Sequence, residues 1–499
     1  MDTNVVVAGW GQITQPKNLI EKPAKTPMGM MEAASRAAAK TLKAPEQICN
    51  VDGILVVKSL SAYYENPADE LAARLGASPK FTFESRIGGN SPQTLINRAA
   101  GMIARNELNM VLVAGAEAYV PRSRNTKKLD SALLQGLPEG YDGDDASGVT
   151  PLEARYGIEH PMQGFPLFET ALWAESGLGL DIYLEQVAQF WSSFSRVAAS
   201  HPYAWSKQAK TPEEIITPTT LNRPIAFPYT KYMNSFVTVD QGAAIILMSE
   251  EYASIHGSAQ GRTVFFCGGG YAEDRQPFMI QKTDFTSSPP LKAAVDKALD
   301  RSGFSLSDMD CFDLYSCFPC AVTIAKKMLG IPADDPRALT LTGGLGFFGG
   351  PGNNYNLHAV ATLCEMISTS KVKTGLTTSL GWFMQKHAAG IYSALPPKNA
   401  LGDMDIRDRE DFLAGPEPIE IDPNPTGQGI IETYTIVYNR NQSPAYAVLY
   451  GKTKKGLRFI ARTKKSPDVY QQLSTNNMVE KPVNLSFDKE KNLNIAVLV

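Results

Sequence analysis

Cysteine and histidine residues in the second half of the chain carry its clearest potential for chemistry. Cys317 forms a Cys-x-x-Cys with Cys320 in the segment YSCFPC, His387 follows Lys386, and His358 lies between these two segments. A thiol becomes nucleophilic when a neighbouring imidazole or lysine lowers its pKa. The chain has only five histidines, so two of them in such segments favour a functional role. The alternative is structural, with Cys317 a small buried side chain and each histidine a hydrogen-bonded core residue.

The Cys-x-x-Cys does not by itself predict a metal site or a redox site. Zinc requires two further ligands, and no second cysteine pair or His-x-x-His lies near Cys317 in the sequence. A thioredoxin-like role would need the surroundings of that fold. We therefore expect no metal.

Two glycine-rich turns accompany these residues. The stretch LTGGLGFFGGPGNNYNLHAVATL, residues 341–363, places six glycines before an apolar helical run that contains His358. Such a density marks either a tight strand-to-helix loop or a place where a ligand approaches the backbone closely. Asn353 and Asn354 suit the N-terminus of the helix, where side-chain oxygens cap free N–H groups. A second turn, RIGGNSPQ, contains Gly88 and Gly89.

The elements that position these turns form a regular series. Continuous Val/Ile/Leu runs alternate with helical segments over the first 120 residues, which indicates a sheet covered on both faces. Strands are predicted at 5–11, 52–57, 80–85 and 109–118, and helices at 29–42, 67–76 and 91–108. A buried strand at 237–253 closes this half, and from residue 263 the same order of elements returns.

Three other regions break the series. Residues 119–237 predict a long insertion with helical pieces, 403–422 are acidic and proline-rich like a linker, and short alternating runs after 423 predict a small β-barrel. The expected domains are a first half at 1–118 and 238–258, an inserted loop domain at 119–237, a second half at 259–402, a linker at 403–422 and a barrel at 423–499.

Composition excludes several classes of protein. The net charge of −3 gives no general case for nucleic-acid or membrane binding, and no apolar run is long enough for a membrane span. The N-terminus predicts a first strand and no signal peptide, and six cysteines in 499 residues make no disulfide framework. We expect a cytoplasmic protein. A basic hairpin in the barrel could bind a polyanion, but a solvated face is favoured and nucleic acid is not expected; its residues are Lys452, Lys454, Lys455, Arg458, Arg462, Lys464 and Lys465.

The repeated halves, the segment VDQGAAIILMSEE, the Gly115-Ala116-Glu117 signature and the GGLGFFGGP loop together resemble the thiolase superfamily over about residues 4–396. This resemblance implies an α/β fold with duplicated halves in αβαβα layers, an inserted loop domain and a C-terminal barrel similar to an OB-fold. It also implies a homodimer through the thiolase core, although the oligomeric state stays open.

The catalytic positions of thiolases are altered in this chain. Family members that make or break carbon–carbon bonds use a nucleophilic cysteine, an activating histidine, a second cysteine and an asparagine. By resemblance these positions fall at Gly89, Gly350, near Leu380, and at Tyr315 or Ser316. A glycine cannot be acylated or transfer a proton, so the standard thiolase cycle is excluded with these residues.

The replacement motifs resemble the subgroup of thiolase-like proteins type 1, which are often labelled acetyl-CoA acetyltransferases. The resemblance implies an acyl-CoA ligand and no permanently bound cofactor. On loops that this fold would bring around one pocket, Cys317 with His387 or His358 could form a relocated pair that accepts an acyl group from a CoA thioester. Backbone amides of both turns would then donate to a thioester oxygen or carboxylate; these residues are Gly88, Gly89, Asn90, Ser91, Gly349, Gly350, Asn353 and Asn354. The alternative is a non-catalytic acyl-CoA binder or scaffold that docks partners through its barrel, and whether the chain is an enzyme stays open.

Overall fold

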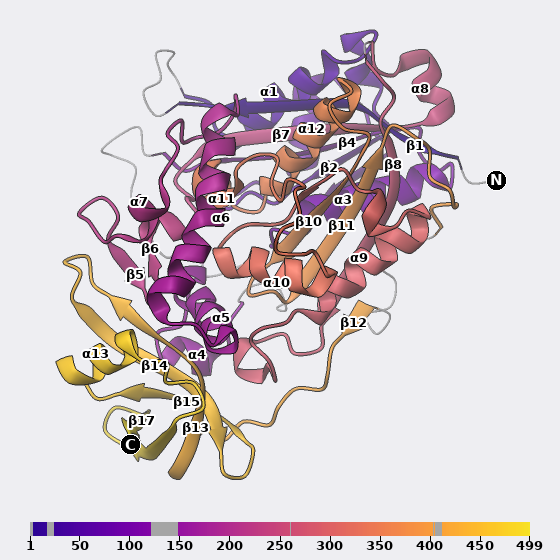
Figure 1. The fold of residues 1–499 in the computed structure, drawn as a ribbon. Helices are drawn as coiled ribbons and strands as arrows, with labels where there is room; N and C mark the ends of the chain where they lie inside the picture. The colour runs from indigo at the N-terminus through magenta and orange to yellow at the C-terminus, as the bar shows by residue number, and fades with distance from the viewer. Residues whose placement is uncertain (1–2, 17–23, 121–147, 260, 403, 405–411) are drawn as a thin grey trace.

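The computed structural model describes residues 3–16, 24–120, 148–259, 261–402, 404 and 412–499. A large layered α/β body contains both halves of the chain, and a smaller β-barrel at the C-terminal end packs beside it (Figure 1). The predicted strand at 80–85 and helix at 91–108 both lie in the large body. Of the expected insertion, residues 121–147 lie outside the described residues, as do 403 and 405–411 of the expected linker.

The first half forms five strands of a sheet, in the order β3-β2-β4-β7-β1. Successive residues of β1 face opposite sides, so Val5 and Val7 join one hydrophobic cluster while Val6 and Ala8 join another. A strand with apolar residues on both faces must be covered on both sides, as the sequence predicts. The strands are β1 Val5–Thr14, β2 Gly53–Val56, β3 Phe81–Glu84, β4 Met110–Ala118 and β7 Asp240–Ser249.

The second half continues the sheet and repeats this arrangement. Its order β8-β11-β10-β9 corresponds to β1-β7-β4-β2, with the same parallel pair at the end and antiparallel pairs elsewhere. The prediction of duplicated halves is therefore confirmed. The strands are β8 Phe265–Asp274, β9 Cys311–Asp313, β10 Thr374–Gly381 and β11 Lys386–Ser393. The short β12, Leu413–Ala414, pairs with β8.

The segment ALTLTGG, residues 338–344, has the apolar pattern of a further strand, and here the structure differs. Only Ala338 and Leu339 accept hydrogen bonds from the backbone of β9 or the residue after it, at 2.9 and 3.0 Å. The chain then leaves the sheet because the N–H of Leu341 donates to the buried Asp313 carboxylate at 2.8 Å. A side-chain acceptor thus replaces the ladder that a strand would need.

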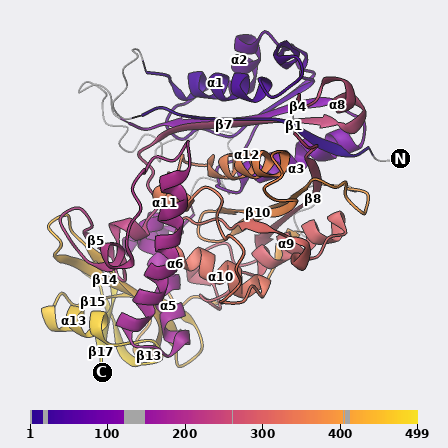
Figure 2. The same ribbon diagram turned by 45° about the horizontal axis from the view of Figure 1, so that its top comes forward.

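Helices form the other layers, and Figure 2 shows the stack along its edge. The helices α3 (Ser91–Ala104) and α12 (Tyr355–Ser368) lie between the two half-sheets, α1 and α2 cover the outside of the first half, and α9 and α10 cover the outside of the second. Glycine allows the outer helices to approach: a Cβ on Gly270 would lie 1.7 Å from the Ala294 carbonyl of α9. The remaining bounds are α1 Pro27–Ala39, α2 Pro67–Leu75, α8 Glu250–His256, α9 Pro289–Ser302, α10 Pro319–Leu329 and α11 Gly344–Phe347.

The described part of the insertion consists mainly of helices. Their packing is aromatic, with Trp173 and Trp191 fully enclosed. The elements are α4 Pro151–Arg155, α5 Pro161–Ser176, α6 Leu180–Ser200, α7 Pro212–Ile216, β5 Pro224–Ala226 and β6 Tyr229–Thr230. Ala226 of β5 pairs with Val437, so the insertion contributes two short strands to the sheet of the C-terminal barrel.

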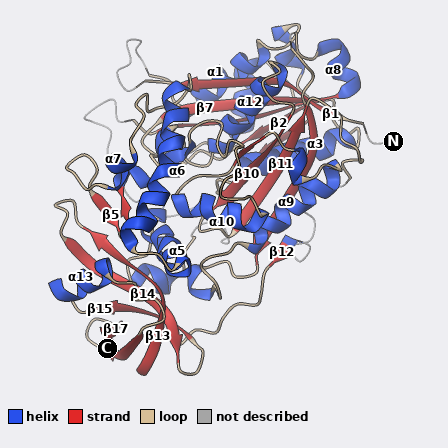
Figure 3. Cartoon of the chain, viewed as in Figure 1, coloured by secondary structure: helices blue, strands red, loops and turns tan. Residues whose placement is uncertain are grey.

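The C-terminal region is a closed five-stranded barrel, as predicted (Figure 3). Its order β14-β15-β17-β16-β13 closes through a β13–β14 pairing. One helix, α13 (Pro467–Thr475), was not predicted, because it lies between segments whose apolar residues alternate with the period of a strand. Its buried Tyr470 and Leu473 have helical spacing after a proline at the first turn. The strands are β13 Gly427–Tyr438, β14 Pro444–Thr453, β15 Arg458–Thr463, β16 Pro482–Asp488 and β17 Leu493–Leu498.

The barrel is joined to the rest of the chain by buried polar contacts. The fully buried Arg458 binds the Glu432 carboxylate and the Lys282 carbonyl. Tyr446 donates its hydroxyl to the Gly157 carbonyl at 2.8 Å. Among the helices that the structure describes, none is long and apolar enough to cross a membrane. The exact domain boundaries stay a prediction.

Candidate functional site

The two glycine-rich turns meet between the half-sheets. One turn leads into α3 and the other into α12, and these helices lie side by side in the central layer. The N–H of Gly88 donates to Asn353 Oδ1 at 3.0 Å, and Asn353 Nδ2 donates to the Lys58 carbonyl at 2.9 Å. One side chain therefore ties both turns to the loop after β2, and the turns are closed against each other.

Gly89, the position of the thiolase nucleophile by resemblance, has no room for a side chain. A Cβ there would lie 2.1 Å from the Tyr315 hydroxyl oxygen and 2.5 Å from the Leu380 carbonyl oxygen. Real Cβ contacts essentially never fall below 3.0 Å. Gly89, Tyr315 and Leu380, which correspond to thiolase catalytic positions by resemblance only, thus lie together, and Tyr315 with Leu380 fills the space that a side chain at Gly89 would need.

Tyr315 is held firmly in this place. Its N–H donates to Thr378 Oγ1 at 2.9 Å, and its ring meets the Tyr355 ring edge-on, with centroids 5.5 Å apart. Burial raises the pKa of the Tyr315 hydroxyl well above its ordinary value. The phenol is therefore a neutral side chain at neutral pH and no ready base.

Close neighbours also explain the glycines of the second turn. A Cβ on Gly352, where φ is +51°, would lie 2.3 Å from Glu117 Oε1, and one on Gly349, where φ is +121°, would lie 2.3 Å from Gln241 Oε1. Glu117 and Gln241 are partners across the β4–β7 ladder. The glycine density therefore lets the turn lie directly on two buried polar side chains, which the sequence did not indicate.

Glu117 is the most strongly perturbed carboxylate at this site. It accepts hydrogen bonds from the N–H groups of Leu60 and Ser61 at 2.7 and 2.8 Å and from the Ser59 hydroxyl at 3.1 Å. Burial raises the pKa of Glu117 to about 7, although these hydrogen bonds oppose the rise. The sequence signature around residues 115–117 located this residue but did not predict its surroundings.

Several of the expected amide donors already have acceptors inside the protein. Gly88 donates to Asn353, Ser91 to the Gly88 carbonyl at 3.0 Å, and Gly350 to the Phe236 carbonyl at 2.9 Å. The Asn354 N–H donates to the Pro351 carbonyl at 2.8 Å. These four amides are thus engaged by turn geometry and not free for a ligand. Within the described ranges, no acceptor contacts the amides of the other four predicted residues, namely Gly89, Asn90, Gly349 and Asn353.

The predicted asparagine caps are absent. Asn354 is the N-cap of α12 but makes no side-chain cap hydrogen bond. Its Nδ2 donates instead to the Gly115 carbonyl at 2.7 Å, and Asn353 reaches across to the first turn. Both asparagines therefore cross-link turns and strands, because their amides lie against neighbouring backbone and not over the first turn of the helix.

The structure does not bring Cys317 together with either candidate histidine. Cys317 is only 6% exposed, and its neighbour Phe318 stacks on Phe165 with centroids 4.4 Å apart. Burial raises the pKa of the Cys317 thiol well above its usual value. No histidine hydrogen-bonds this thiol in the described structure, so the buried-thiol alternative matches the geometry.

Both histidines have other partners. His387 Nε2 lies 3.0 Å from Ser288 Oγ, and His358 Nδ1 lies 2.9 Å from Gln12 Oε1. Burial and the nearby Lys282 lower the pKa of His387 to about 3, and burial with His201 lowers the pKa of His358 to about 3. Each is a neutral, hydrogen-bonded core histidine at neutral pH, as the structural alternative requires.

The two cysteines of the Cys-x-x-Cys form no disulfide. All six cysteines are free thiols. Cys320 Sγ donates to the Phe165 carbonyl at 3.5 Å, and burial raises its pKa. A search of the described residues finds no group of three or more His, Cys, Asp or Glu side chains placed to hold a metal ion.

The basic hairpin of the barrel is partly used for internal contacts. Arg458 is buried against Glu432 and Lys282, as described above. Arg462 lies over the Tyr446 ring at 4.2 Å and donates Nε to the Tyr156 carbonyl at 3.2 Å. These two arginines therefore stabilise the barrel and its attachment, and they are not displayed for a polyanion.

Comparisons with known proteins agree with this geometry. The crystal structure of a monomeric SCP2-thiolase like protein type 1 from Mycobacterium smegmatis superposes with a TM-score of 0.81 and 28% identity, covering 99% of both chains. The human mitochondrial 3-ketoacyl-CoA thiolase shares the fold, with a TM-score of 0.54 and 17% identity over 79% of this chain and 99% of its own. The chain thus has a thiolase-like fold.

The C-terminal barrel adds a second point of similarity to known proteins. Residues 412–490 match the family model described as the thiolase-like protein type 1 additional C-terminal domain. In its fold and in this additional domain the chain is similar to thiolase-like proteins of type 1. An acetyl-CoA acetyltransferase of Schizosaccharomyces pombe is 23% identical over 352 residues, covering 66% of this chain and 83% of the relative. The relative from M. smegmatis is described as monomeric, so the comparisons lend no support to the expected homodimer.

Proposed function

We propose that this protein binds a CoA thioester non-covalently and does not transfer the acyl group through Cys317. The ligand class is supported by the acetyl-CoA acetyltransferase relative and by the thiolase fold. The single observation that carries the non-covalent part is the position of the Tyr315 hydroxyl and the Leu380 carbonyl, 2.1 and 2.5 Å from a Cβ at Gly89. A nucleophile at the inherited position would have to displace both.

Acyl transfer at Cys317 would need a thiolate and a base. Burial raises the pKa of Cys317 and lowers the pKa of His387 and His358, so the thiol stays protonated and the imidazoles stay in their own hydrogen bonds. Each unit of raised thiol pKa makes the thiolate tenfold rarer, at about 1.4 kcal/mol. A relocated Cys-His pair therefore has neither the contact nor the protonation states that nucleophilic catalysis requires.

Recognition of the thioester would rest on backbone donors. The amides of Gly89, Asn90, Gly349 and Asn353 are the predicted donors that remain for a thioester carbonyl or a carboxylate. Their burial makes each hydrogen bond stronger than one at the surface. The use of these four amides by a ligand is a proposal, because Asn353 holds the two turns against each other.

The test titrates the full chain with CoA and with acetyl-CoA by calorimetry and then weighs the intact protein. We expect saturable heat with both ligands and no acetyl adduct, in the native chain and in Cys317→Ala alike. An adduct that disappears in Cys317→Ala would restore the covalent mechanism. The absence of heat with either ligand would remove CoA from the proposal.

A scaffold that docks partners through the barrel is the weaker candidate. The barrel already binds the rest of the chain through Arg458, Tyr446 and Arg462, so this part of its surface is occupied. A cytoplasmic location, expected from the cysteine usage and the N-terminal segment, stays a proposal, and so does the homodimer, which rests on the resemblance alone. Sedimentation of the purified chain at several concentrations measures the oligomeric state.

A further inference from the structure

One outer face of the C-terminal barrel is made of uncharged side chains. Directly opposite residues on neighbouring strands point to the same side of a sheet. Gln428 of β13 pairs with Asn484 of β16, and Asn484 pairs with Val497 of β17. Residues two positions along these strands continue the face on either side of this row. We call this set the uncharged face; its residues are Gln428, Ile430, Pro482, Asn484, Ser486, Ile495 and Val497.

The apolar members of the uncharged face are accessible to solvent. Ile430 is 44% exposed and Val497 is 42% exposed, whereas the alternating Val483 and Leu485 of β16 are buried inside the barrel. Val499, two positions beyond Val497, is 66% exposed. Exposed aliphatic side chains gathered on one face, without a charge between them, mark a contact surface.

Lysines border the uncharged face. Lys481 directly precedes Pro482, and Lys464 directly follows the last residue of β15, whose partner on β17 is the neighbour of Val497. Both lysines are exposed. Within the part of the chain that the structure describes, neither makes an ion pair with a carboxylate. Their ammonium groups are therefore available to an anionic partner.

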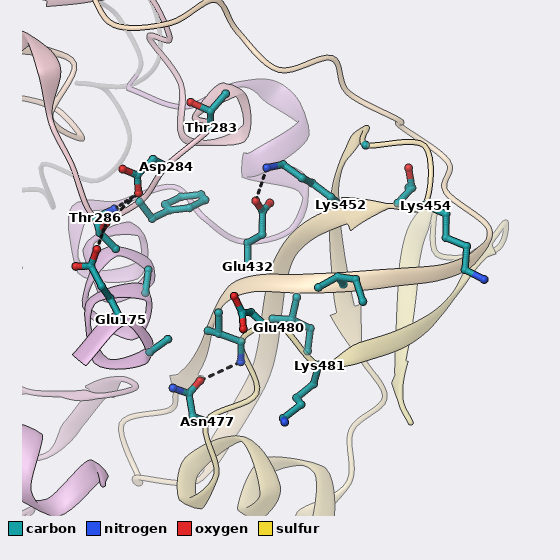
Figure 4. A pocket seen from close by; sticks show the side chains of 18 residues that line it. Glu175, Thr283, Asp284, Thr286, Glu432, Lys452, Lys454, Asn477, Glu480 and Lys481 are labelled. Atoms are coloured by element: carbon teal, nitrogen blue, oxygen red, sulfur yellow. Dashed lines mark hydrogen bonds and ion pairs between the residues drawn. The ribbon is translucent and has the colours of Figure 1, made fainter. Parts of the chain in front are cut away.

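The cavity between the barrel and the layered body does not gather these charges. Its volume is about 850 Å³, and four carboxylates line it together with three lysines. Lys454 and Lys481 belong to this lining, but their side chains extend away from each other (Figure 4). The positive charge of the barrel is therefore spread over its surface and not concentrated in the cavity.

Charge is divided unevenly along the chain. Residues 423–499 contain eleven Lys and Arg against five Asp and Glu, a net charge of +6, whereas the whole chain has −3. The rest of the chain therefore carries −9. The barrel lies at one end of the molecule (Figure 1), so an anionic surface attracts this end and repels the other.

The uncharged face lacks the residues on which protein interfaces depend most. Trp, Tyr and Arg supply most of the binding energy where two proteins meet, and none of the seven residues is of these types. A lipid surface requires aliphatic side chains that reach its apolar layer and lysines against its anionic headgroups. The uncharged face with its bordering lysines meets both requirements.

We infer that the uncharged face docks on an anionic lipid surface, with Ile430 and Val497 at the boundary between headgroups and acyl chains and with Lys464 and Lys481 against the headgroups. The contact is reversible, because it buries few aliphatic side chains and depends on charges that salt screens. It goes beyond the proposed function and does not depend on CoA binding, since none of its residues lies in the glycine-rich turns.

The experiment mixes the full chain with vesicles of phosphatidylcholine and with vesicles that also contain phosphatidylserine, and measures the protein that sediments with them. We expect binding to the anionic vesicles only, and its loss as the salt concentration rises. Lys464→Gln/Lys481→Gln should weaken this binding by about tenfold, because two contacts with anionic headgroups are removed. Ile430→Ser/Val497→Ser should weaken it by about fivefold, because less apolar area enters the lipid.

The matched controls remove the same kinds of side chain from residues outside the barrel. Lys371→Gln/Lys373→Gln removes two exposed lysines, and Ile182→Ser/Ile255→Ser removes two isoleucines that are 55% and 63% exposed. We expect both controls to bind the anionic vesicles like the native chain. Circular dichroism of each variant confirms that the chain is folded before binding is compared.

Equal binding to neutral and anionic vesicles, or equal losses in the variants of the uncharged face and in the controls, would overturn this inference. Absence of binding to both kinds of vesicle would overturn it as well and would leave the uncharged face to a protein partner. The calorimetric titration with CoA decides the proposed function separately, so the failure of one proposal does not decide the other.

Discussion

Replacement of Gly89 by alanine tests whether the inherited nucleophile position is filled. The new Cβ would lie 2.1 Å from Tyr315 Oη, 2.5 Å from the Leu380 carbonyl oxygen and 2.7 Å from Tyr315 Cζ. Ordinary contacts begin near 3.4 Å, so the neighbours must move by roughly 1 Å in a packed core. Overpacking of this kind costs about 1–3 kcal/mol, and we expect the upper end because one neighbour is backbone.

A double-mutant cycle with Tyr315→Phe assigns this cost to the hydroxyl. Removing Oη leaves Cζ and the Leu380 carbonyl as the nearest atoms, so Gly89→Ala should cost about 1 kcal/mol less in that background. The assay is urea unfolding followed by circular dichroism, with all variants compared at one pH and temperature. Gly29→Ala is the matched control, because its nearest neighbour would be 3.5 Å away in a helix, and it should stabilise by about 0.5–1 kcal/mol.

A cost of Gly89→Ala under about 1 kcal/mol without coupling to Tyr315→Phe would contradict a filled position. That result would mean that the turn yields easily and that room for a side chain exists. Gly89→Cys would then be expected to fold, and acylation of the introduced thiol by acetyl-CoA would become a sensible measurement. A large cost with clear coupling would support a position filled by Tyr315.

Three further predictions concern residues away from Gly89. Arg458→Met should destabilise the attachment of the barrel by about 3 kcal/mol, because it removes a buried charge from the Lys282 carbonyl and the Glu432 carboxylate. Lys452 also binds Glu432 but is 36% exposed, so Lys452→Met should cost under about 1 kcal/mol. Hydrogen exchange of β15 measures both effects, and equal effects would contradict the buried role of Arg458. The pKa of Glu117 is raised to about 7, so its protonated form stabilises the fold fully below the unfolded pKa near 4.5, and this contribution is lost as the pH rises through 7. Glu117→Gln should therefore flatten the decline of the unfolding free energy between pH 4.5 and 7. An unchanged slope would refute the raised pKa of Glu117. A thiol reagent should modify Cys49 rapidly in the native chain and the other five cysteines only after unfolding; fast labelling of Cys317 would show that it is accessible.

The fold was predictable because its signals are local and repeated. Continuous apolar runs at β1, β4 and β7 specify strands covered on both faces, and the returning order of elements specifies two equivalent halves. The helix α13 was missed because its Tyr470 and Leu473 were read among alternating strands. The segment 338–344 failed as a strand for a different reason, since the Asp313 carboxylate that replaces its ladder lies about 28 residues upstream of the amide it binds.

The site was less predictable because its contacts join distant segments. Sequence could point to both glycine turns and to Tyr315, but not to the bond between Gly88 and Asn353, which are separated by 265 positions. The same limit applies to Cys317 and the histidines, whose roles depend on burial and not on residue type. A thiol and an imidazole carry chemistry only when the fold brings them into contact and lets water or a partner charge stabilise the ionised forms.

Glycine-rich turns in a buried place have backbone N–H groups that need acceptors, and the contacts between the two turns supply some of them. A bare backbone turn facing a cavity would leave N–H groups without acceptors, at about 1–3 kcal/mol for each. Asn353 satisfies one such group at Gly88, and Phe236 satisfies another at Gly350. The glycines leave room for these neighbouring groups, and the neighbouring groups accept the hydrogen bonds of the turns. The two sets of residues therefore depend on each other. A side chain introduced at Gly89 alone would break this set of contacts, so room for a nucleophile there would require changes on both turns and at Tyr315.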